Sequence, residues 1–188
     1  MRKKTGVGEF IRALLKVLAA VFAAYLLARF AIAKTVVDGV SMYPTLNDGE
    51  NVVIDKLSYR IGEPKRFDII VFEEEISDTG YFIKRIIGLP GEEVTIDKRG
   101  NVYINGKVLR DSHGYGVIAD PGMAVEGVMV GEAEYFVLGD NRNNSADSRM
   151  RDVGNVSRDD VLGRVVLRIW PLEKFGFIDL YMDRKGTP

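Results

Sequence analysis

The pattern of hydrophobic and polar residues changes once along the chain, close to residue 34. Before that point, residues 13–33 are almost entirely apolar, and no proline or glycine interrupts them. After it, short runs of β-branched and aromatic residues alternate with turns rich in Gly, Asn and Asp, as is typical of β-strands. The pattern therefore predicts an N-terminal helix of residues 13–33, followed by a mainly β domain of residues 34–182.

Several runs in the β domain have the length and composition of strands. Asn105 and Gly106 lie between two of them and form the dipeptide preferred in two-residue hairpins of type I′. No long helical period is present, so we expect largely antiparallel sheets. The predicted strands are residues 51–55, 67–72, 81–87, 94–96, 102–104, 107–109, 135–138 and 161–169.

Other segments fall outside this strand pattern. Residues 111–131 lack periodicity and predict a long irregular loop. Ser157 begins a capping box, so we expect one helical turn before the last strand. Trp170 is expected in the core, with the membrane interface as the alternative. Residues 183–188 form a C-terminal tail that is expected to fray.

The charge distribution favours a membrane role for the N-terminal segment. Residues 1–34 carry seven basic residues and one acidic residue, whereas the rest of the chain carries a net charge of −7. Basic residues before an apolar segment stay on the cytoplasmic side of a membrane. We therefore expect a single-pass protein of the cell membrane, with residues 1–12 in the cytoplasm and residues 34–182 outside it. The acidic remainder argues against nucleic-acid binding.

The length of the apolar segment leaves alternatives open. Its charge-free centre, residues 17–28, has 12 residues, whereas a spanning helix needs about 20. Lys16 and Arg29 would have to extend toward opposite interfaces. The alternatives are a helix buried in a soluble protein and a cleaved secretory signal, for which residues 31–33 would be a small-x-small site. Arg29 argues against the cleaved signal, because that region is usually uncharged.

The reactive side chains restrict the possible chemistry. The chain has no cysteine and a single histidine, His113, so a thiolate metal site and a cysteine nucleophile are excluded. Ser41 follows the apolar segment, and a serine hydroxyl needs a base to become a good nucleophile. That base is either His113 or an unprotonated lysine.

Lys84 has the sequence context that an unprotonated lysine requires. Its pKa would have to fall by about 3 units from roughly 10.4, which burial among apolar groups can achieve. In a strand, Lys84 shares a face with Phe82 and Ile86, while Arg85 points to the opposite face.

Simpler interpretations of the same residues exist. A serine such as Ser41 before a proline can shape a turn, and a lysine can protect an edge strand. Residues 139–149 are rich in side chains that hold loops through hydrogen bonds. They do not match a calcium loop, because Arg142 occupies a ligand position.

Four stretches, residues 39–46, 67–72, 81–92 and 139–149, resemble in this order the four sequence boxes of bacterial type I signal peptidases. The resemblance covers essentially the whole chain, which is similar to the compact members with one N-terminal anchor. It implies a catalytic domain of twisted antiparallel sheets with an apolar surface near the membrane. It also implies removal of signal peptides from exported preproteins after small-x-small sites such as Ala-x-Ala.

The resemblance further implies roles for individual residues. Ser41 would be the nucleophile and Lys84 the general base, with Ser145 positioning the lysine amine. Gly39 stands where some members carry a serine, so backbone N–H groups at Gly39 and Ser41 would form the oxyanion hole. The residues expected to support the site are Arg85, Asp140, Asn141, Asp147 and Arg149. The residues expected in the substrate pocket are Val37, Met42 and Ile83.

The implied partners are exported preproteins and the lipid bilayer. No cofactor, metal or nucleic acid is expected, and the sequence specifies no oligomeric state. Three alternatives compete with the signal peptidase interpretation. They are a soluble Ser-Lys protease of the self-cleaving repressor type, a non-catalytic anchored domain that binds exported proteins, and a Ser-His hydrolase that uses His113.

Overall fold

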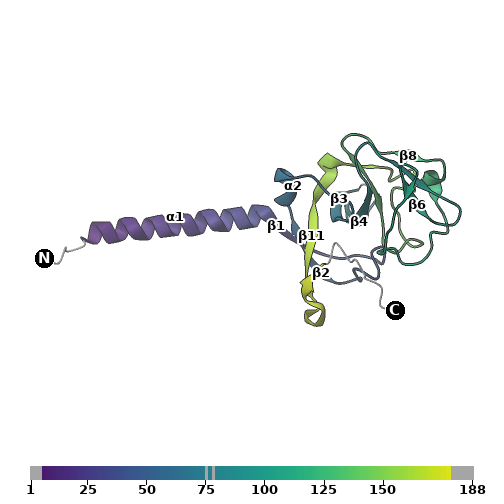
Figure 1. Ribbon diagram of the computed structural model, residues 1–188. Helices are drawn as coiled ribbons and strands as arrows, with labels where there is room; N and C mark the ends of the chain where they lie inside the picture. Colours follow the sequence, from purple (N-terminus) through teal and green to yellow (C-terminus); the bar gives the residue numbers. More distant parts are fainter. Residues whose placement is uncertain (1–5, 75, 78, 179–188) are drawn as a thin grey trace.

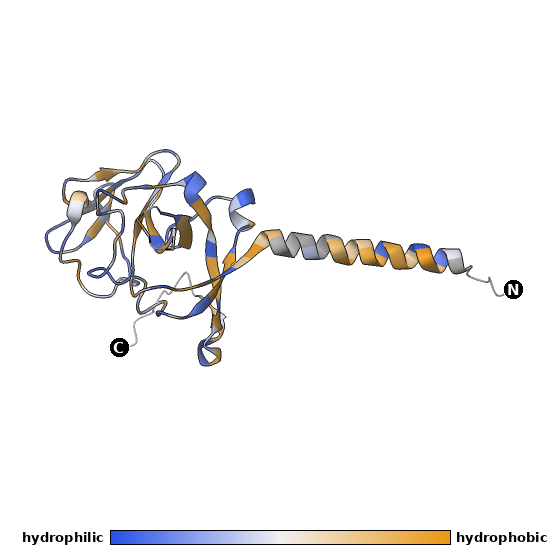
Figure 2. Cartoon of the chain, turned by 180° about the vertical axis from the view of Figure 1, so that it is seen from behind, coloured by the Kyte–Doolittle hydropathy of each residue, from blue (hydrophilic) through white to orange (hydrophobic). Residues whose placement is uncertain are grey.

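A long N-terminal helix extends away from a β body in the computed structural model, which describes residues 6–74, 76–77 and 79–178 (Figure 1). The helix α1 spans Val7–Ala31, or 25 residues, which corresponds to about 37 Å. Apolar residues follow much of its length (Figure 2). The last two residues of the predicted anchor, Ile32 and Ala33, already belong to the first strand.

Among the described residues, no helix combines the length and the apolar character required to cross a bilayer.

The larger sheet contains eight strands and carries most of the residues of interest. The strands pair in the order β1-β2-β11-β3-β4-β9-β10, with β12 beside β11. Each of these pairs is antiparallel, as the sequence pattern predicts. The bounds are β1 Ile32–Val36, β2 Asn51–Asp55, β3 Ile69–Glu73, β4 Tyr81–Gly88, β9 Glu134–Leu138, β10 Val156–Ser157, β11 Val161–Trp170 and β12 Gly176–Phe177.

A smaller sheet of four strands, in the order β7-β6-β5-β8, is formed by the part of the chain between β4 and β9 of the larger sheet. Asn105 and Gly106 have φ angles of 49° and 75°, which is the left-handed backbone that a type I′ turn requires at both central positions. The predicted hairpin between β6 and β7 is therefore present. The bounds are β5 Glu93–Ile96, β6 Val102–Ile104, β7 Lys107–Val108 and β8 Val128–Met129.

Short helical turns connect the strands. The Ser157 side chain accepts a hydrogen bond of 3.2 Å from the backbone N–H of Asp159, so the expected cap is formed, and the turn after it is a 3₁₀ helix. The predicted irregular loop, residues 111–131, also contains a 3₁₀ turn and strand β8. The helical segments after α1 are α2 Ser58–Ile61, η1 Gly122–Val125, η2 Arg158–Asp160 and η3 Leu172–Lys174.

The structure corrects two expectations from the sequence. Strand β3 begins at Ile69 instead of residue 67, because Phe67 has a φ of 71°, which no strand residue adopts. Trp170 is 53% exposed at the end of β11, so the expectation of a core tryptophan is wrong. The predicted tail, residues 183–188, lies outside the described residues.

Gly88, at the end of β4, lies where the two sheets meet. A Cβ atom at this position would lie 2.5 Å from Val94 Cγ2, 2.9 Å from Phe136 Cβ and 3.0 Å from Val130 Cγ2. These three neighbours are fully or almost fully buried and belong to one apolar cluster. Even a single methyl group would therefore force the sheets apart.

We expect Gly88→Ala to lower the free energy of unfolding by about 1–3 kcal/mol through overpacking of this junction. The control is Gly62→Ala, because a Cβ at Gly62 would contact only Ser58 O, at 3.5 Å. Urea denaturation measures both variants. Equal stability of Gly88→Ala and the wild type would contradict the close packing described here.

Candidate active site

Ser41 lies in the loop between β1 and β2, which is held down by buried apolar side chains. Met42 and Leu46 are almost fully buried in the core that underlies β2 and β3. The N–H of Leu46 donates to Met42 O over 2.9 Å, which closes a tight turn. Burial of Met42 leaves Ser41 partly exposed at the surface of the loop. The apolar Met42 thus enters the core, and the neighbouring Ser41 hydroxyl lies at the cleft.

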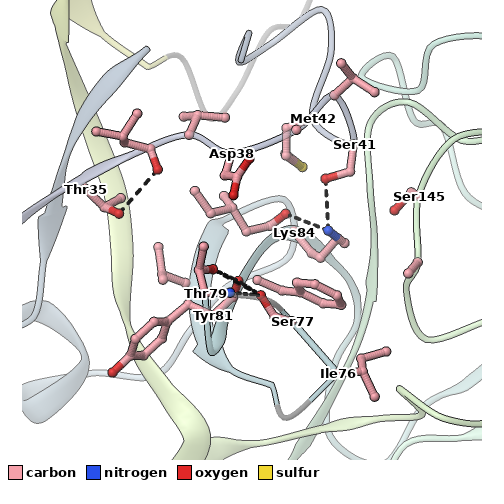
Figure 3. Close-up of a pocket in the computed structure, with 18 of the residues that line it drawn as sticks. Thr35, Asp38, Ser41, Met42, Ile76, Ser77, Thr79, Tyr81, Lys84 and Ser145 are labelled. Atoms are coloured by element: carbon pink, nitrogen blue, oxygen red, sulfur yellow. Dashed lines mark hydrogen bonds between the residues drawn. The ribbon is translucent and has the colours of Figure 1, made fainter. Parts of the chain in front are cut away.

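Lys84 reaches Ser41 from strand β4. Its Nζ donates to Ser41 Oγ over 2.9 Å and to Ile83 O over 3.2 Å (Figure 3). The same Nζ lies 4.4 Å from the centre of the Phe82 ring, on the strand face that the sequence predicts. Only 3% of Lys84 is exposed.

Burial determines the protonation state of Lys84. Desolvation lowers its pKa from the ordinary value of 10.5 to about 8, although the charge of Asp147 acts in the opposite direction. No carboxylate is paired with the amine among the described residues. The unprotonated amine is therefore accessible near neutral pH, and it can accept the proton of the serine hydroxyl.

A cleft of about 370 Å³ surrounds the two side chains. One wall is residues 35–42, and the other is formed by residues 81–84 of β4. The three predicted pocket residues, Val37, Met42 and Ile83, all line it. Further lining residues, which the sequence did not predict for the pocket, are Thr35, Val36, Asp38, Val40, Val71, Ile76, Ser77, Thr79, Tyr81, Phe82, Asn144 and Ala146.

The half of β4 that lines the cleft has a free edge. β9 pairs with β4 only from Arg85 onward, whereas β3 pairs with its whole length from Tyr81 to Arg85. Among the described strands, none pairs with Tyr81–Lys84 on the side away from β3. Backbone groups of this segment are thus available to an extended peptide, which could add to the sheet edge.

Arg85 and Asp140 form a buried ion pair behind Lys84. Both side chains are completely buried, and the guanidinium donates to the carboxylate through Nε at 2.7 Å and Nη2 at 2.6 Å. Thr45 Oγ1 also donates to Asp140, at 2.5 Å. The pair therefore connects strand β4 to the loop after β9 and to the Ser41 loop.

Asn141 contacts the Ser41 loop directly. Its N–H donates to Ser41 O over 2.9 Å, and its Nδ2 donates to Val40 O over 3.1 Å. These two bonds hold the two peptide groups on either side of the Ser41 Cα atom. Asn141, which is expected to support the site, therefore contacts the backbone of Ser41 itself.

Asp147 and Arg149 brace the loop that follows β9. Arg149 Nε donates to Asp147 Oδ1 over 2.8 Å, and its Nη2 donates to Arg142 O over 2.5 Å. Asp147 Oδ2 accepts a hydrogen bond of 3.1 Å from the N–H of Gly139. Both charged side chains are buried, so this network holds residues 139–149 in one conformation.

Ser145 lines the cleft without contacting the lysine amine. Its Oγ is buried and has no hydrogen-bond partner within the described part of the chain, and Figure 3 shows it across a gap from Lys84. The expected hydrogen bond to the lysine is thus not formed in this structure. A Cβ at Gly139 would lie 2.2 Å from Ser145 Oγ and 2.6 Å from Ser41 O, so only glycine allows these two segments to approach.

The backbone N–H groups near Ser41 are not equivalent. Gly39, whose φ is 89°, donates its N–H to Asp48 Oδ1 over 2.8 Å. The Gly39 amide is therefore occupied in this structure. The N–H of Ser41 makes no hydrogen bond to the residues that the structure describes, so it is the amide available to an oxyanion.

His113 is not part of this cleft. Its Nδ1 lies 2.9 Å from Asp111 Oδ1, and its ring lies 5.0 Å from the ring of Phe67. Ser41 instead contacts Lys84, so the geometry disfavours the Ser-His alternative.

Comparison with known proteins assigns the family. The family described as "Signal peptidase, peptidase S26" matches residues 10–170. The chain belongs to this family. It is 41% identical over 152 residues to "Probable signal peptidase I-2" of Synechocystis sp. (strain ATCC 27184 / PCC 6803 / Kazusa), covering 78% of this chain and 67% of the relative. It is 38% identical over 166 residues to "Signal peptidase I T" of Bacillus subtilis (strain 168), covering 82% of each chain.

A solved structure is also similar to this chain. It is a crystal structure of a signal peptidase I from Enterococcus faecalis V583 at 2.27 Å resolution. The two chains are 35% identical, with a TM-score of 0.46, and the match covers 55% of this chain and 97% of the other.

We expect the Cε signal of Lys84 to titrate with a midpoint near pH 8, because burial lowers its pKa to about 8. The amine is then mostly protonated at pH 7 and mostly neutral at pH 9. NMR of the protein with ¹³C-labelled lysine measures the midpoint, and Lys84→Met identifies the signal. A midpoint at the ordinary value for lysine would show that the amine is solvated.

Proposed function

We propose that this chain is a membrane-bound serine endopeptidase that removes N-terminal signal peptides from exported preproteins. The observation that carries the proposal is the buried Lys84 amine, which donates to the Ser41 hydroxyl inside an open cleft. Membership of the signal peptidase family and relatives named signal peptidase I support the substrate class.

In the proposed reaction, Ser41 is the nucleophile and Lys84 the general base. The neutral amine takes the hydroxyl proton while Ser41 Oγ attacks the scissile carbonyl. The Ser41 N–H stabilises the oxyanion; such a donor can contribute about 3 kcal/mol. Lys84 then gives its proton to the leaving amine. Finally, Lys84 takes a proton from a water molecule while the water oxygen attacks the acyl carbon. Lys84 returns this proton to Ser41 Oγ as the ester bond breaks, which releases the acyl group as a carboxylic acid.

Ser145 is proposed to position the lysine amine when substrate is bound. Its buried hydroxyl has no partner among the described residues, and a hydroxyl in that state gains from any hydrogen bond it can make. The proposed contact would require a rotation about the Cα–Cβ bond of Ser145, which reorients Oγ in the wall of the cleft. The proposed role of the supporting residues is to hold the side chains of Ser41, Lys84 and Ser145 in place relative to one another; these supporting residues are Arg85, Asp140, Asn141, Asp147 and Arg149.

The cleft also suggests why small residues would be preferred at alternate positions. An extended peptide along the free edge of Tyr81–Lys84 presents every second side chain to the same side. The floor on that side contains the apolar side chains of Val37, Met42 and Ile83. Two shallow subsites separated by one residue would select a small-x-small sequence such as Ala-x-Ala.

The N-terminal segment is proposed to anchor the protein, with the expected anchor, residues 13–33, in the bilayer up to the end of α1 at Ala31. Large apolar side chains are exposed along α1, among them Leu15, Val21 and Phe22, and an apolar surface of this kind is unfavourable in water. Residues 1–12 would remain in the cytoplasm and residues 34–182 would form the extracytoplasmic catalytic domain, in agreement with the basic N-terminus.

We expect the full chain to stay in the membrane pellet after alkaline carbonate extraction of bacterial cells that express it. A chain lacking residues 1–31 but retaining β1 should move to the supernatant, because it keeps the β body without α1. Intact mass of the membrane form should correspond to the full sequence. A chain starting at Lys34 would exclude a permanent anchor.

We expect Ser41→Ala and Lys84→Ala each to reduce kcat/KM by about 10⁴-fold or more. Each substitution removes a group that takes part directly in bond formation or proton transfer. His113→Ala should retain activity within about 10-fold. The assay is cleavage of a preprotein with an Ala-x-Ala site in detergent. Loss of activity only in His113→Ala would identify a different base, and a folded but inert wild type would favour the binding-domain alternative.

A further inference from the structure

Asp38 is a charged residue of the cleft that the proposed reaction does not use. It lies two residues after the end of β1 and lines the cleft together with Ser41. Its side chain points into the space between the two walls (Figure 3). Within the described part of the chain, its carboxylate makes no hydrogen bond and no ion pair. An unpaired acid is thus presented to whatever occupies the cleft.

The other cleft-lining groups leave this carboxylate without a counter-charge. Asp38 and Lys84 are the two charged side chains among the described residues that line the cleft. The reactive form of Lys84 is neutral, so the reactive cleft carries a single negative charge. The opposite rim contributes the uncharged hydroxyl-bearing residues Ser77, Thr79 and Tyr81.

We propose that Asp38 is a specificity-determining residue, which makes the cleft favour basic and reject acidic side chains close to the scissile bond. This inference rests on the proposed peptidase function. Ser41 is three positions after Asp38, which limits the distance between their Cα atoms to about 10 Å. The substrate side chain that interacts with Asp38 therefore lies within about three positions of the scissile bond.

The charge of Asp38 acts on the substrate and not on the base. Asp147 is the carboxylate whose charge influences Lys84. Removing the charge of Asp38 should therefore alter the choice of substrate and leave the pH dependence of cleavage unchanged. A substitution that merely disturbed the Ser41 loop would lower the activity on all substrates alike.

The test uses quenched fluorescent peptides with an Ala-x-Ala site, carrying Lys, Gln or Glu at each position from three before to two after the cut. We expect the wild type to prefer Lys to Glu by roughly 5- to 10-fold in kcat/KM for at least one position. Asp38→Asn should bring that ratio close to 1, and Asp38→Lys should invert it. The preference should weaken as salt is added.

The matched control is Glu132→Gln, which removes one negative charge from an exposed position outside the cleft. It should keep the wild-type ratio. An Asp38→Asn ratio equal to that of the wild type at every position would overturn the proposal, as would a shared decrease on all peptides.

A separate measurement distinguishes failure of this proposal from failure of the proposed function. If the wild type cleaves none of the peptides, the peptidase function fails. Fluorescence anisotropy of the same peptides with Ser41→Ala then decides the charge preference without any cleavage. Equal affinity for the Lys and Glu peptides would overturn the role of Asp38, and tighter binding of the Lys peptides that is lost in Ser41→Ala/Asp38→Asn would support it.

Discussion

A buried ion pair between Arg85 and Asp140 holds the candidate site together. It joins three segments that are distant in the sequence, because Thr45 of the Ser41 loop also donates to the same carboxylate. Breaking a pair of this kind leaves an isolated charge in the core, which typically costs about 3–5 kcal/mol. The position of Ser41 relative to Lys84 thus depends on a contact that touches neither side chain.

Lys84 and Arg85 are neighbours in sequence and have opposite electrostatic environments. The strand directs them to opposite faces. Arg85 meets a carboxylate on its face and remains a structural cation, whereas Lys84 meets the Phe82 ring and the Ser41 hydroxyl. Burial without an ion-pair partner is what lowers the pKa of Lys84. Exchanging the two environments would leave no base beside Ser41.

The sequence predicts the strands of this protein better than it predicts their contacts. The alternation of residues 81–87 places Lys84 on a face with Phe82, and the hairpin at Asn105 follows from the turn chemistry of a single dipeptide. Nothing local specifies that Lys84 meets a serine 43 residues earlier. The sequence offers His113 and Lys84 as candidate bases for Ser41, and the resemblance to a known family selects Lys84.

The expectations that the structure changed have physical causes in long-range packing. Trp170 is apolar enough for a core, yet it lies at the end of β11, where the sheet reaches the surface. Strands of two residues, such as β10 and β12, have no periodicity to detect. The cleft residues Ser77 and Thr79 lie in a polar turn, and only the fold brings that turn opposite Asp38.

Strand β4 changes its environment between Lys84 and Arg85, and this boundary explains how a rigid sheet can contain a substrate cleft. From Arg85 onward, β9 covers the strand edge and the side chains are fully buried. Before Arg85, the same strand keeps β3 on one side and an open edge on the other. The lysine therefore sits on the last residue of the open half, where it is rigid enough to lose solvent and close enough to the edge to reach a bound peptide.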